Sequence, residues 1–493
     1  MNKHYLLLIL AVLLIPLSAA QEDFLSTHKL RLSVNISSDM ELAPSSSDYK
    51  IDYILADLSF FPREDDIQRV ISLTTEPEAQ SGNNSLIYEW ENLFNDLSFL
   101  IKSEIETRNR FRTVDKKIEF PLRNLPEEIV PYTLPSDNID SDDNNIIILS
   151  SSLAEGEDDL YIVVNKLANW VKISVKYSLD TLTAEVSQKA SWVMNAREGV
   201  CDEITTLFIA MTRSVGIPAR YISGVAYTNW KGMNDFGHHA WAEVYFPGYG
   251  WLPFDITYNQ MGFIDPGHIK LKESIDSNEP STEYEWKGVD IDIKTQGLNI
   301  ETKVLERIGK IDPLFLIEAR VLKSSIGFGS YNLIEAEITN LNNFYLTTEL
   351  SVSKTNEITV FEESKKNIVL KPNEKKKVYW VIRLRENLDS HYTYTFPIQV
   401  YSLRNVTSKA NFTSTINEPV FTFKEINSLK EEIEEEAVKK YSKKLSLNCT
   451  TEKNEYYIYE IASINCRIEN LGNVLLTDLE ACLKEDCKTI DLG

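Results

Sequence analysis

The chain has 493 residues, enough for several domains that each bury a core of their own. It carries 51 Lys and Arg residues against 74 Asp and Glu residues, a formal net charge of −23. Nucleic acids and anionic lipid surfaces select clustered basic side chains, so this balance argues against nucleic acid as a partner and against anionic lipid as a main one.

The first 20 residues have the layout of a signal peptide. Lys3 precedes an apolar run from Tyr5 to Leu17, and small residues stand before Gln21. The run is short for a membrane span, and an uncleaved N-terminal anchor is the alternative. Sequons for N-glycosylation also fit export, and they begin at Asn35, Asn83, Asn405, Asn411 and Asn448. We therefore expect a secreted or cell-surface protein.

The cysteines divide into one single residue and one distal group. Cys201 lies 248 residues from the next cysteine, and the others are Cys449, Cys466, Cys482 and Cys487. An oxidising location favours disulfides within the distal group, and spacings of 17 and 5 residues make two local bridges the natural choice. Three connectivities are possible, and a zinc site is the alternative. Cys201 is left over, and an odd thiol in an exported protein needs an explanation.

Predicted elements change character along the chain. Residues 21–150 mix strand patterns with acidic loops, with a helix expected between Leu86 and Ile105. Helical periodicity follows from Asp158, and one helix begins at Cys201 itself and ends at Gly216. An apolar stripe marks that helix: Ile204, Leu207, Phe208, Met211 and Val215. Period-two strands then follow, with the sequences RYISGVAY, HAWAEVYF and GWLPFDIT.

The C-terminal part is β-rich and contains an internal repeat. ITNLNNFYLTTEL (338–350) and IENLGNVLLTDLE (468–480) match at six of thirteen positions. Period-two runs around both copies predict immunoglobulin-like β-sandwiches. A charged segment between them predicts a helical spacer. The second copy stops at Gly493, short of the later strands of the first, so we expect a truncated module or a chain that continues to a membrane anchor.

A thiol acts as a nucleophile only as the thiolate, and a helix N-terminus favours that anion. Asp202 and Glu203 in the same turn oppose it, so a histidine partner and an orienting group are needed. GHHAWAEVY supplies His239, and Asp255 follows 16 residues later in the next strand. A hairpin pairing Phe246 with Trp251 would turn these two side chains to opposite faces, so their meeting requires a bulge or another turn.

The residues carry a family resemblance. GVC before an amphipathic helix, RSVGIPARYISG, and HAWAEVYFPGYGWLPFD resemble the transglutaminase-like superfamily of papain-related folds over about residues 158–268. The resemblance implies that Cys201 is the nucleophile, His239 the general base and acid, and Asp255 the orienting carboxylate. Cys-Asp-Glu stands where animal transglutaminases have Cys-Trp, which favours hydrolysis over cross-linking.

Other aromatic and histidine residues have simpler interpretations. Trp170 either packs in the core or donates its indole N–H to an oxyanion, as an upstream aromatic does in some relatives. His238 is interpreted as a neighbour of the catalytic group. His268 and His391 are expected at the surface or in loops. No metal and no organic cofactor are required.

The fold class predicted is multidomain. An α+β papain- and transglutaminase-like core follows an α/β-mixed N-terminal region and precedes all-β immunoglobulin-like sandwiches. The expected boundaries are a signal peptide at 1–20, a β-rich region at 21–150, the catalytic domain at 151–280, a sandwich at 300–420, a charged helical linker at 421–444 and a second, truncated module with disulfides at 445–493.

The function predicted is acyl transfer by a cysteine enzyme with a Cys-His-Asp triad. Hydrolysis of peptide or isopeptide bonds in an extracellular protein or peptide is the first hypothesis. Cross-linking of glutamine to lysine is the alternative. A non-catalytic adhesion or structural protein, attached to the cell surface through its β-modules or through sequence after Gly493, is the third. Sequence does not identify the substrate, because nothing marks the residues that line the cleft.

Overall fold

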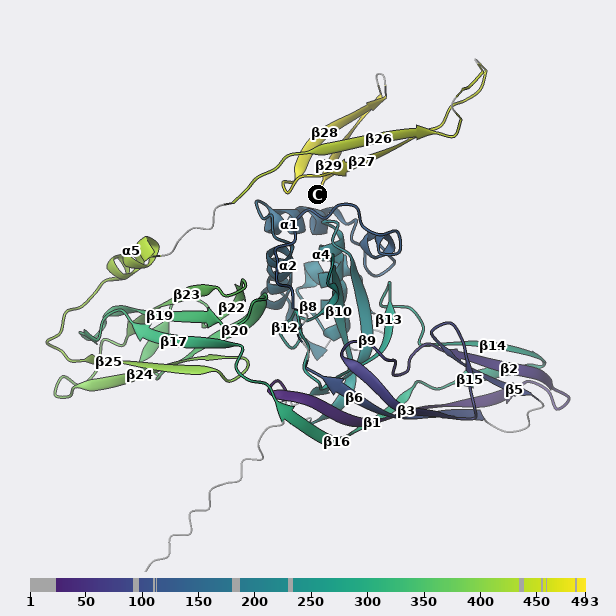
Figure 1. Ribbon diagram of the computed structural model, residues 1–493, viewed down its shortest axis with the longest axis horizontal. Coiled ribbons are helices and arrows are strands. Elements are labelled where there is room, and N and C mark those ends of the chain that lie inside the picture. Colours follow the sequence, from purple (N-terminus) through teal and green to yellow (C-terminus); the bar gives the residue numbers. More distant parts are fainter. Residues whose placement is uncertain are drawn as a thin grey trace, which may run out of the picture.

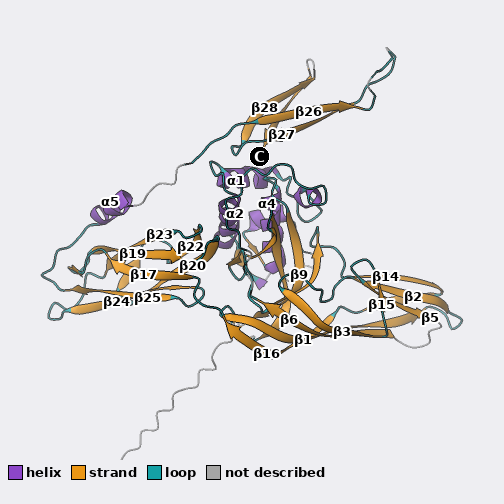
Figure 2. Cartoon of the chain, in the orientation of Figure 1, coloured by secondary structure: helices purple, strands orange, loops and turns teal. Residues whose placement is uncertain are grey.

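The computed structural model describes residues 24–493 except 92–96, 110, 112, 180–186, 229–233, 434–438, 454, 458 and 484–485. The expected signal peptide lies outside this part of the chain. Most of the helices gather at the centre of the molecule, one lies apart from them, and β-rich parts extend from the centre (Figures 1 and 2). Within the described residues, no helix is both long and apolar enough to cross a membrane.

An N-terminal β-sandwich is built from two sheets that share one apolar core. The first sheet has the order β15-β1-β6-β3, with β16 also paired to β1. Its strands are β1 (Thr27–Pro44), β3 (Gln68–Glu76), β6 (Leu97–Arg108), β15 (Ile291–Thr295) and β16 (Asn299–Lys310). The second sheet has the order β14-β2-β5-β4. Its strands are β2 (Lys50–Leu58), β4 (Gln80–Ser81), β5 (Leu86–Glu91) and β14 (Thr282–Val289).

Two expectations for this part are wrong. The helix expected between Leu86 and Ile105 is replaced by β5 and β6, because alternate residues of β6 are buried in the sandwich core, as a period of two requires. Residues 300–310, which were assigned to the immunoglobulin-like sandwich, instead pair with β1 as most of β16. The chain thus returns to the N-terminal sandwich after the central part.

The central part combines four helices with one five-stranded sheet of order β12-β11-β10-β9-β13. The helices are α1 (Asn144–Ala154), α2 (Leu160–Ser174), α3 (Ala190–Ala196) and α4 (Cys201–Arg213). The strands are β9 (Ala219–Thr228), β10 (Asp235–Phe246), β11 (Gly250–Asp255), β12 (Gln260–Met261) and β13 (His268–Ser274). Short elements complete it: η1 (Val130–Thr133), β7 (Lys176–Tyr177) and β8 (Glu198–Gly199).

Helix α4 is the central element of this part. Its predicted stripe packs in the core, but the structure buries every residue from Glu203 to Arg213 because α1, α2, α3 and β10 surround the helix. Buried polar groups are therefore hydrogen-bonded: the Arg213 guanidinium donates to the carbonyls of Ala219, Leu134 and Ile275. These bonds fix the C-terminal end of α4 against the start of β9.

The second face of the central sheet is covered by the N-terminal sandwich. Val225, Ile269 and Leu271 of β9 and β13 belong to the apolar core of that sandwich, whereas Ala240, Ala242 and Val244 of β10 belong to the core beneath the helices. A sheet buried on both faces explains the nearly continuous apolar run in β10. The sheet is therefore held from both sides.

A second β-sandwich follows, with sheet orders β17-β19-β23-β21 and β18-β25-β24-β20-β22 around one core. The first sheet comprises β17 (Phe315–Val321), β19 (Tyr331–Asn340), β21 (Ile358–Val360) and β23 (Lys375–Leu384). The second comprises β18 (Ser325–Ile326), β20 (Leu346–Ser353), β22 (Lys365–Leu370), β24 (Tyr394–Ser402) and β25 (Thr407–Ser414). The fold class predicted from the sequence is confirmed.

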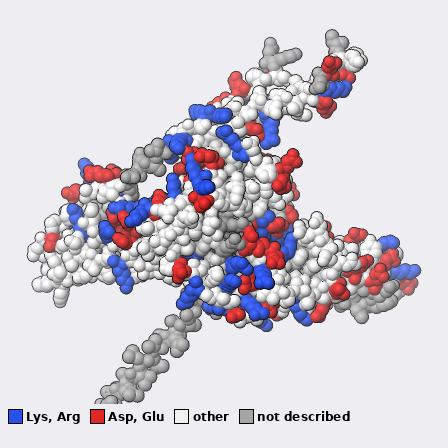
Figure 3. Space-filling model, viewed as in Figure 1, with Lys and Arg blue, Asp and Glu red and all other residues white. Residues whose placement is uncertain are grey.

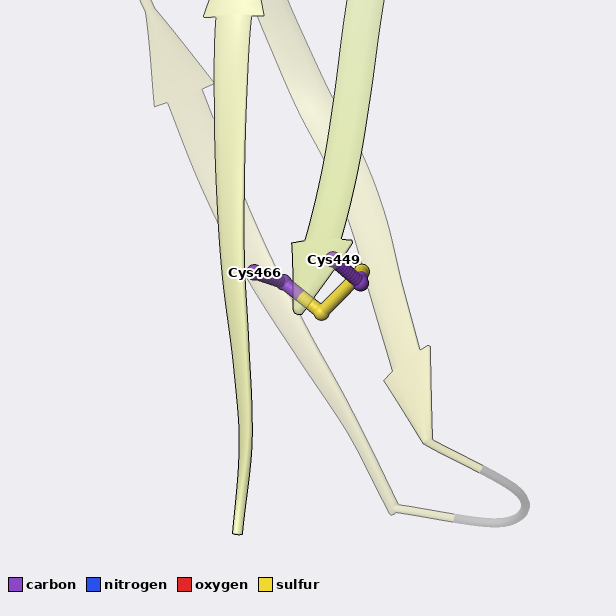
Figure 4. Close-up of a disulfide and its surroundings, with 2 residues drawn as sticks. All are labelled: Cys449 and Cys466. Carbon is purple, nitrogen blue, oxygen red and sulfur yellow. A yellow bond between two sulfur atoms is a disulfide. The ribbon is translucent and has the colours of Figure 1, made fainter. Parts of the chain in front are cut away.

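The distal part contains helix α5 (Phe423–Ile433) and two two-stranded sheets. One sheet pairs β26 (Leu445–Thr451) with β27 (Ile464–Asn470), and the other pairs β28 (Leu476–Leu483) with β29 (Asp486–Leu492). Disulfides join Cys449 to Cys466 (Figure 4) and Cys482 to Cys487. The two local bridges are confirmed, and the cysteines are not arranged as a zinc site.

The sequence repeat corresponds to one shared turn. The Asn340 side chain accepts from the Asn342 N–H and donates to the Phe344 carbonyl, at 3.0 and 2.8 Å. Asn470 makes the equivalent bonds with Gly472 and Val474, at 2.9 and 2.8 Å. In both copies this turn carries the chain from one sheet to another, so the repeated letters specify a crossing between sheets.

Charges of both signs are interspersed over the face of the molecule drawn in Figure 3. Most ion pairs lie at the surface, where each contributes little stability. One network of ion pairs in the central sheet is instead buried. Glu243 of β10 contacts Arg220 of β9 at 2.6 Å and Lys270 of β13 at 3.1 Å. It ties three adjacent strands together.

One glycine of β9 sets the spacing of the central sheet. A Cβ on Gly224 would lie 2.0 Å from the Ile269 carbonyl of β13 and 3.0 Å from the Trp241 ring. We predict that Gly224→Ala lowers the free energy of unfolding by about 1–3 kcal/mol, because the backbone of β13 must move. Thermal unfolding followed by circular dichroism measures it. Gly237→Ala, in β10 with no atom within 4 Å of its Cβ, is the matched control, and equal melting temperatures for both variants would contradict this account.

Candidate active site

Three elements of the central part bring the predicted site residues together. Cys201 is the first residue of α4, His239 lies in β10, and Asp255 is the last residue of β11. His239 Nε2 lies 2.7 Å from Asp255 Oδ2, and both side chains are buried. Thr205 of α4 donates to the Ala240 carbonyl at 3.2 Å, which fixes the helix beside the strand that carries His239.

The hairpin register explains why His239 and Asp255 share a face. The ladder pairs Phe246 with Gly250 and Ala242 with Phe254, not Phe246 with Trp251. Asp255 therefore stands beside Trp241, two residues from His239, and an even offset keeps both side chains on one face. Positive φ angles at Gly248 (83°) and Gly250 (81°) make this turn possible. The turn, and not a bulge, therefore places the His239 and Asp255 side chains on the same face of the sheet.

The thiol of Cys201 is half-buried and has two polar neighbours. Sγ donates to Asp202 Oδ1 at 3.4 Å, and the Ala240 N–H donates to Sγ. Because Ala240 follows His239 in β10, the sulfur lies next to the histidine backbone. In this arrangement the thiol proton points to Asp202 and not to His239.

Electrostatics around Cys201 disfavour the thiolate. Burial raises the pKa of the Cys201 thiol, and the Asp202 carboxylate raises it further, so that it lies well above its usual range despite the Ala240 N–H. The Asp255 carboxylate also raises it, and Glu203 Oε2 accepts from the Val200 N–H at 2.8 Å at the same helix N-terminus. Burial and these carboxylates therefore favour the thiol over the thiolate in this arrangement.

Asp255 carries a second partner that the sequence interpretation missed. His268 Nε2 lies 2.9 Å from the same Oδ2 atom that contacts His239. His268 is 3% exposed, so the expectation of a surface or loop histidine is wrong. Burial opposes ionisation of Asp255, but His239 and His268 hold the pKa of this carboxyl well below its usual range. The only signal in the sequence is Asp265-Pro-Gly-His268, a turn that leads into a strand.

Other singled-out residues lie around this cluster without joining it. His238 is exposed, as a neighbour rather than a partner of Asp255. Trp170 of α2 packs against the core and lies 4.4 Å from the Arg197 guanidinium. Arg220 stacks on Trp251 and pairs with Glu243, which gives it a structural role.

Two cavities meet at His238 and His239, which line both of them. The larger, about 660 Å³, is mainly apolar and aromatic, with walls that include Val171, Lys172, Tyr177, Leu179, Tyr227 and Tyr258. The smaller, about 420 Å³, is more polar, with walls that include Asp202, Tyr221, Ser223, Ser277, Glu279 and Ser281. Trp170 lines neither cavity. Cys201 itself lines neither cavity either, but Asp202 and Ile204 of the same helix line the smaller and the larger one, respectively.

Tyr177 and Lys172 are two polar groups of the larger cavity that the sequence interpretation missed. Burial and the nearby Cys201 raise the pKa of Tyr177 to about 12, so its hydroxyl is a neutral donor near the sulfur. Burial lowers the pKa of Lys172, whose Nζ donates to the Thr257 carbonyl at 2.9 Å. Neither residue belongs to a motif that chain order alone reveals.

Among the described residues, one group has the donor atoms of a metal site: His239, Asp255 and His268, with ligand atoms within 4.8 Å of one another. In the structure, Asp255 Oδ2 accepts from both imidazoles. The cluster is thus satisfied by its own hydrogen bonds, and an ion would have to break both. We assign no metal to it.

Comparison with known proteins agrees with this architecture. Residues 148–256 match the model of the transglutaminase-like superfamily. This segment of the chain is a transglutaminase-like core, with Cys201 at the start of a helix and His239 and Asp255 on neighbouring strands.

Similar curated proteins match only part of this chain. The uncharacterized protein YebA of Bacillus subtilis is 24% identical over 152 residues, which cover 28% of this chain and 20% of that protein. The uncharacterized protein Rv2569c of Mycobacterium tuberculosis is 32% identical over 108 residues, 20% of this chain and 34% of that protein. The chain thus spans only a fifth to a third of the length of these relatives.

Solved structures align at low identity. A candidate cysteine protease from Cytophaga hutchinsonii aligns with a TM-score of 0.43 and 19% identity, over 57% of this chain and 92% of that one. Red sea bream transglutaminase aligns with a TM-score of 0.22 and 10% identity, over 88% of this chain and 83% of that one.

The hydrogen bond from Cys201 to Asp202 generates a prediction. Asp202→Asn removes a charge that raises the pKa of the thiol, so the rate of Cys201 alkylation by iodoacetamide at pH 7 should rise about tenfold. Intact-protein mass spectrometry follows the reaction, because the other four cysteines are in disulfides. Asp143→Asn makes the same charge change in the same part of the chain and keeps the N-cap of α1, so it should leave the rate unchanged. A rate that is unchanged in Asp202→Asn would contradict the prediction.

Proposed function

We propose that the protein is a cysteine acyl-transfer enzyme that acts on amide bonds, with Cys201 as nucleophile, His239 as general base and acid, and Asp255 as orienting carboxylate. One observation carries the proposal: a buried His239–Asp255 pair, 2.7 Å apart, stands beside a lone thiol at a helix N-terminus. Because Nε2 of His239 is held by Asp255, Nδ1 is the nitrogen left for the thiol.

The first half of the reaction forms a thioester. Rotation about the Cα–Cβ bond takes Sγ from Asp202 to His239, which accepts the thiol proton. The thiolate attacks the amide carbonyl carbon, and a tetrahedral oxyanion forms. Collapse breaks the C–N bond, and the imidazolium of His239 gives its proton to the leaving amine or ammonia. Because burial and Asp202 raise the pKa of the thiol, His239 takes the thiol proton as the sulfur attacks.

Oxyanion stabilisation falls to groups near the sulfur. Cys201 is the first residue of α4, so its N–H has no partner within the helix and is suitably placed as one donor. For the second donor, Tyr177 is better supported than Trp170. Tyr177 lines the larger cavity and keeps its proton, whereas Trp170 stacks with Arg197 and lines neither cavity.

The second half of the reaction separates the alternatives. Attack of water on the thioester, with His239 as base, releases the acid and restores the thiol, as in a peptidase or amidase. Attack of a lysine amine gives a cross-link. Cross-linking is kept as the alternative because His239 lines two cavities. An acyl donor bound in one cavity would leave the other open to the lysine amine. We put hydrolysis first, since Cys-Asp-Glu replaces the Cys-Trp of animal transglutaminases.

Three features support an extracellular site of action. The N-terminus has the pattern of a signal peptide, two disulfides are formed in the distal sheets, and the sandwiches resemble surface modules. We propose a secreted or cell-surface enzyme that acts on an extracellular protein or peptide. An adhesion protein with an unused triad is the remaining alternative.

Alkylation of Cys201 in the full chain between pH 4 and 10 tests the triad without a known substrate. His239→Ala should slow alkylation at pH 7 by about 100-fold, since the base is lost. Asp255→Asn should slow it by about tenfold or more, because the imidazole is no longer oriented. Cys201→Ala should give no labelling. Alkylation that follows an ordinary thiol, with a pKa of about 8.5, and is unchanged in His239→Ala would refute the triad.

Turnover then distinguishes the classes. New amino termini in a peptide library indicate hydrolysis, whereas ammonia release with incorporation of a fluorescent amine indicates cross-linking. Surface binding retained by Cys201→Ala, with no turnover by the parent protein on any library, would instead support adhesion.

A further inference from the structure

The triad does not use every buried group of its cluster. Asp255 Oδ2 accepts from His239 Nε2 at 2.7 Å and from His268 Nε2 at 2.9 Å. An ionised carboxylate only accepts hydrogen bonds, so each of these two nitrogens carries a hydrogen. One oxygen atom is therefore fixed by two rings that approach from different strands, β10 and the start of β13.

The far side of the His268 ring is also held. Its Nδ1 lies 3.2 Å from Asp265 Oδ1. Asp265 accepts from Gln260 Nε2 at 2.6 Å and from the Gly267 N–H at 2.7 Å, so its own position is fixed by a local turn. With a carboxylate on each ring nitrogen, His268 has two acceptors and is suited to the imidazolium form.

Charge favours the same state. Burial alone would lower the pKa of His268, but Asp265 and Asp255 raise it to about 10. The titratable groups that face the ring are those two carboxylates, His239 and Tyr258, and Trp241 packs edge-on at 5.4 Å. One cation thus stands between the buried Asp255 carboxylate and the partly buried Asp265 carboxylate, and the negative charge that faces His239 is partly neutralised.

The neighbouring strand makes room for this arrangement. His239 stands opposite Gly224 and His268 stands opposite Ala226 in the ladders of β9. Two small residues therefore separate the two histidines, and the ring centroids are 5.7 Å apart.

We propose that His268 is a positioning residue which, clamped by Asp265, fixes the Asp255 carboxylate and through it the orientation of His239. The inference rests on the proposed function, since it concerns the same triad. It assigns a role to a histidine outside the Cys-His-Asp motifs. It also makes the turn at residues 265–268 part of the site.

Three variants of the full chain separate charge from hydrogen bonding. His268→Gln keeps an N–H donor for Asp255 but removes the cation, so the pH profile of Cys201 alkylation should move to higher pH by about one unit. Asp265→Asn should also move the pH profile to higher pH, because His268 then loses its charge. The displacement should be smaller than that in His268→Gln. His268→Ala removes the donor as well, and its maximal rate should fall about tenfold to 100-fold below that of His268→Gln.

His391→Gln is the matched control. His391 also contacts an aspartate, Asp389 at 2.7 Å, but it is exposed and lies in the second sandwich, so its profile should superimpose on that of the parent. Thermal unfolding identifies any variant that fails to fold. Nitrogen-15 NMR of labelled histidine adds a direct readout: the signal lost in His268→Gln should belong to an imidazolium at pH 8.

The outcomes are distinct. A parent rate that depends on His239, with displaced profiles in His268→Gln and Asp265→Asn, supports both proposals. The same dependence on His239 with superimposed profiles overturns the inference and leaves the proposed function. A neutral His268 at pH 8 also overturns the inference. A parent rate that is indifferent to His239→Ala overturns both.

Discussion

The structure of the central part depends on one buried negative charge. Asp255 is fully buried, and a carboxylate withdrawn from water is stable only when it is paired and hydrogen-bonded. Its partners are two imidazoles from different strands and the Tyr258 N–H, which donates to Oδ1 at 2.9 Å. Satisfying this one group requires β10, the end of β11 and the start of β13 to meet at Asp255.

The same constraint extends to the N-terminal sandwich. The turn that presents His268 is fastened by Thr107 of β6, whose hydroxyl donates to the Pro266 carbonyl at 2.5 Å. Gln68 of β3 donates to the Lys270 carbonyl at 2.9 Å, two residues further along β13. Together with the shared apolar core of Val225, Ile269 and Leu271, these bonds make the sandwich a structural support for one side of the site. This accounts physically for the return of the chain to that sandwich after β13.

Rest and reaction require different positions of the sulfur. In the structure the thiol donates to Asp202, and burial with adjacent carboxylates disfavours the thiolate, which is the form that alkylating agents and oxidants attack. The groups that would use it are already ordered, because His239 and Asp255 are held by packing and hydrogen bonds that do not involve the sulfur. In the proposed enzyme the base is thus already in position, whereas the nucleophile is held as a thiol that donates to Asp202.

Sequence by itself determined the helix that starts at Cys201, the strands that carry His239 and Asp255, the local disulfides and the β-rich ends of the chain. Each of these follows from local periodicity, from turn residues or from short spacing along the chain. Tertiary structure alone decided the rest. The position of His268 depends on a crossing of strands and on small residues in β9, and the pairing of 300–310 with β1 joins segments more than 250 residues apart. β5 and β6 were mistaken for a helix because a short apolar run has no fixed period until a partner sheet buries alternate residues.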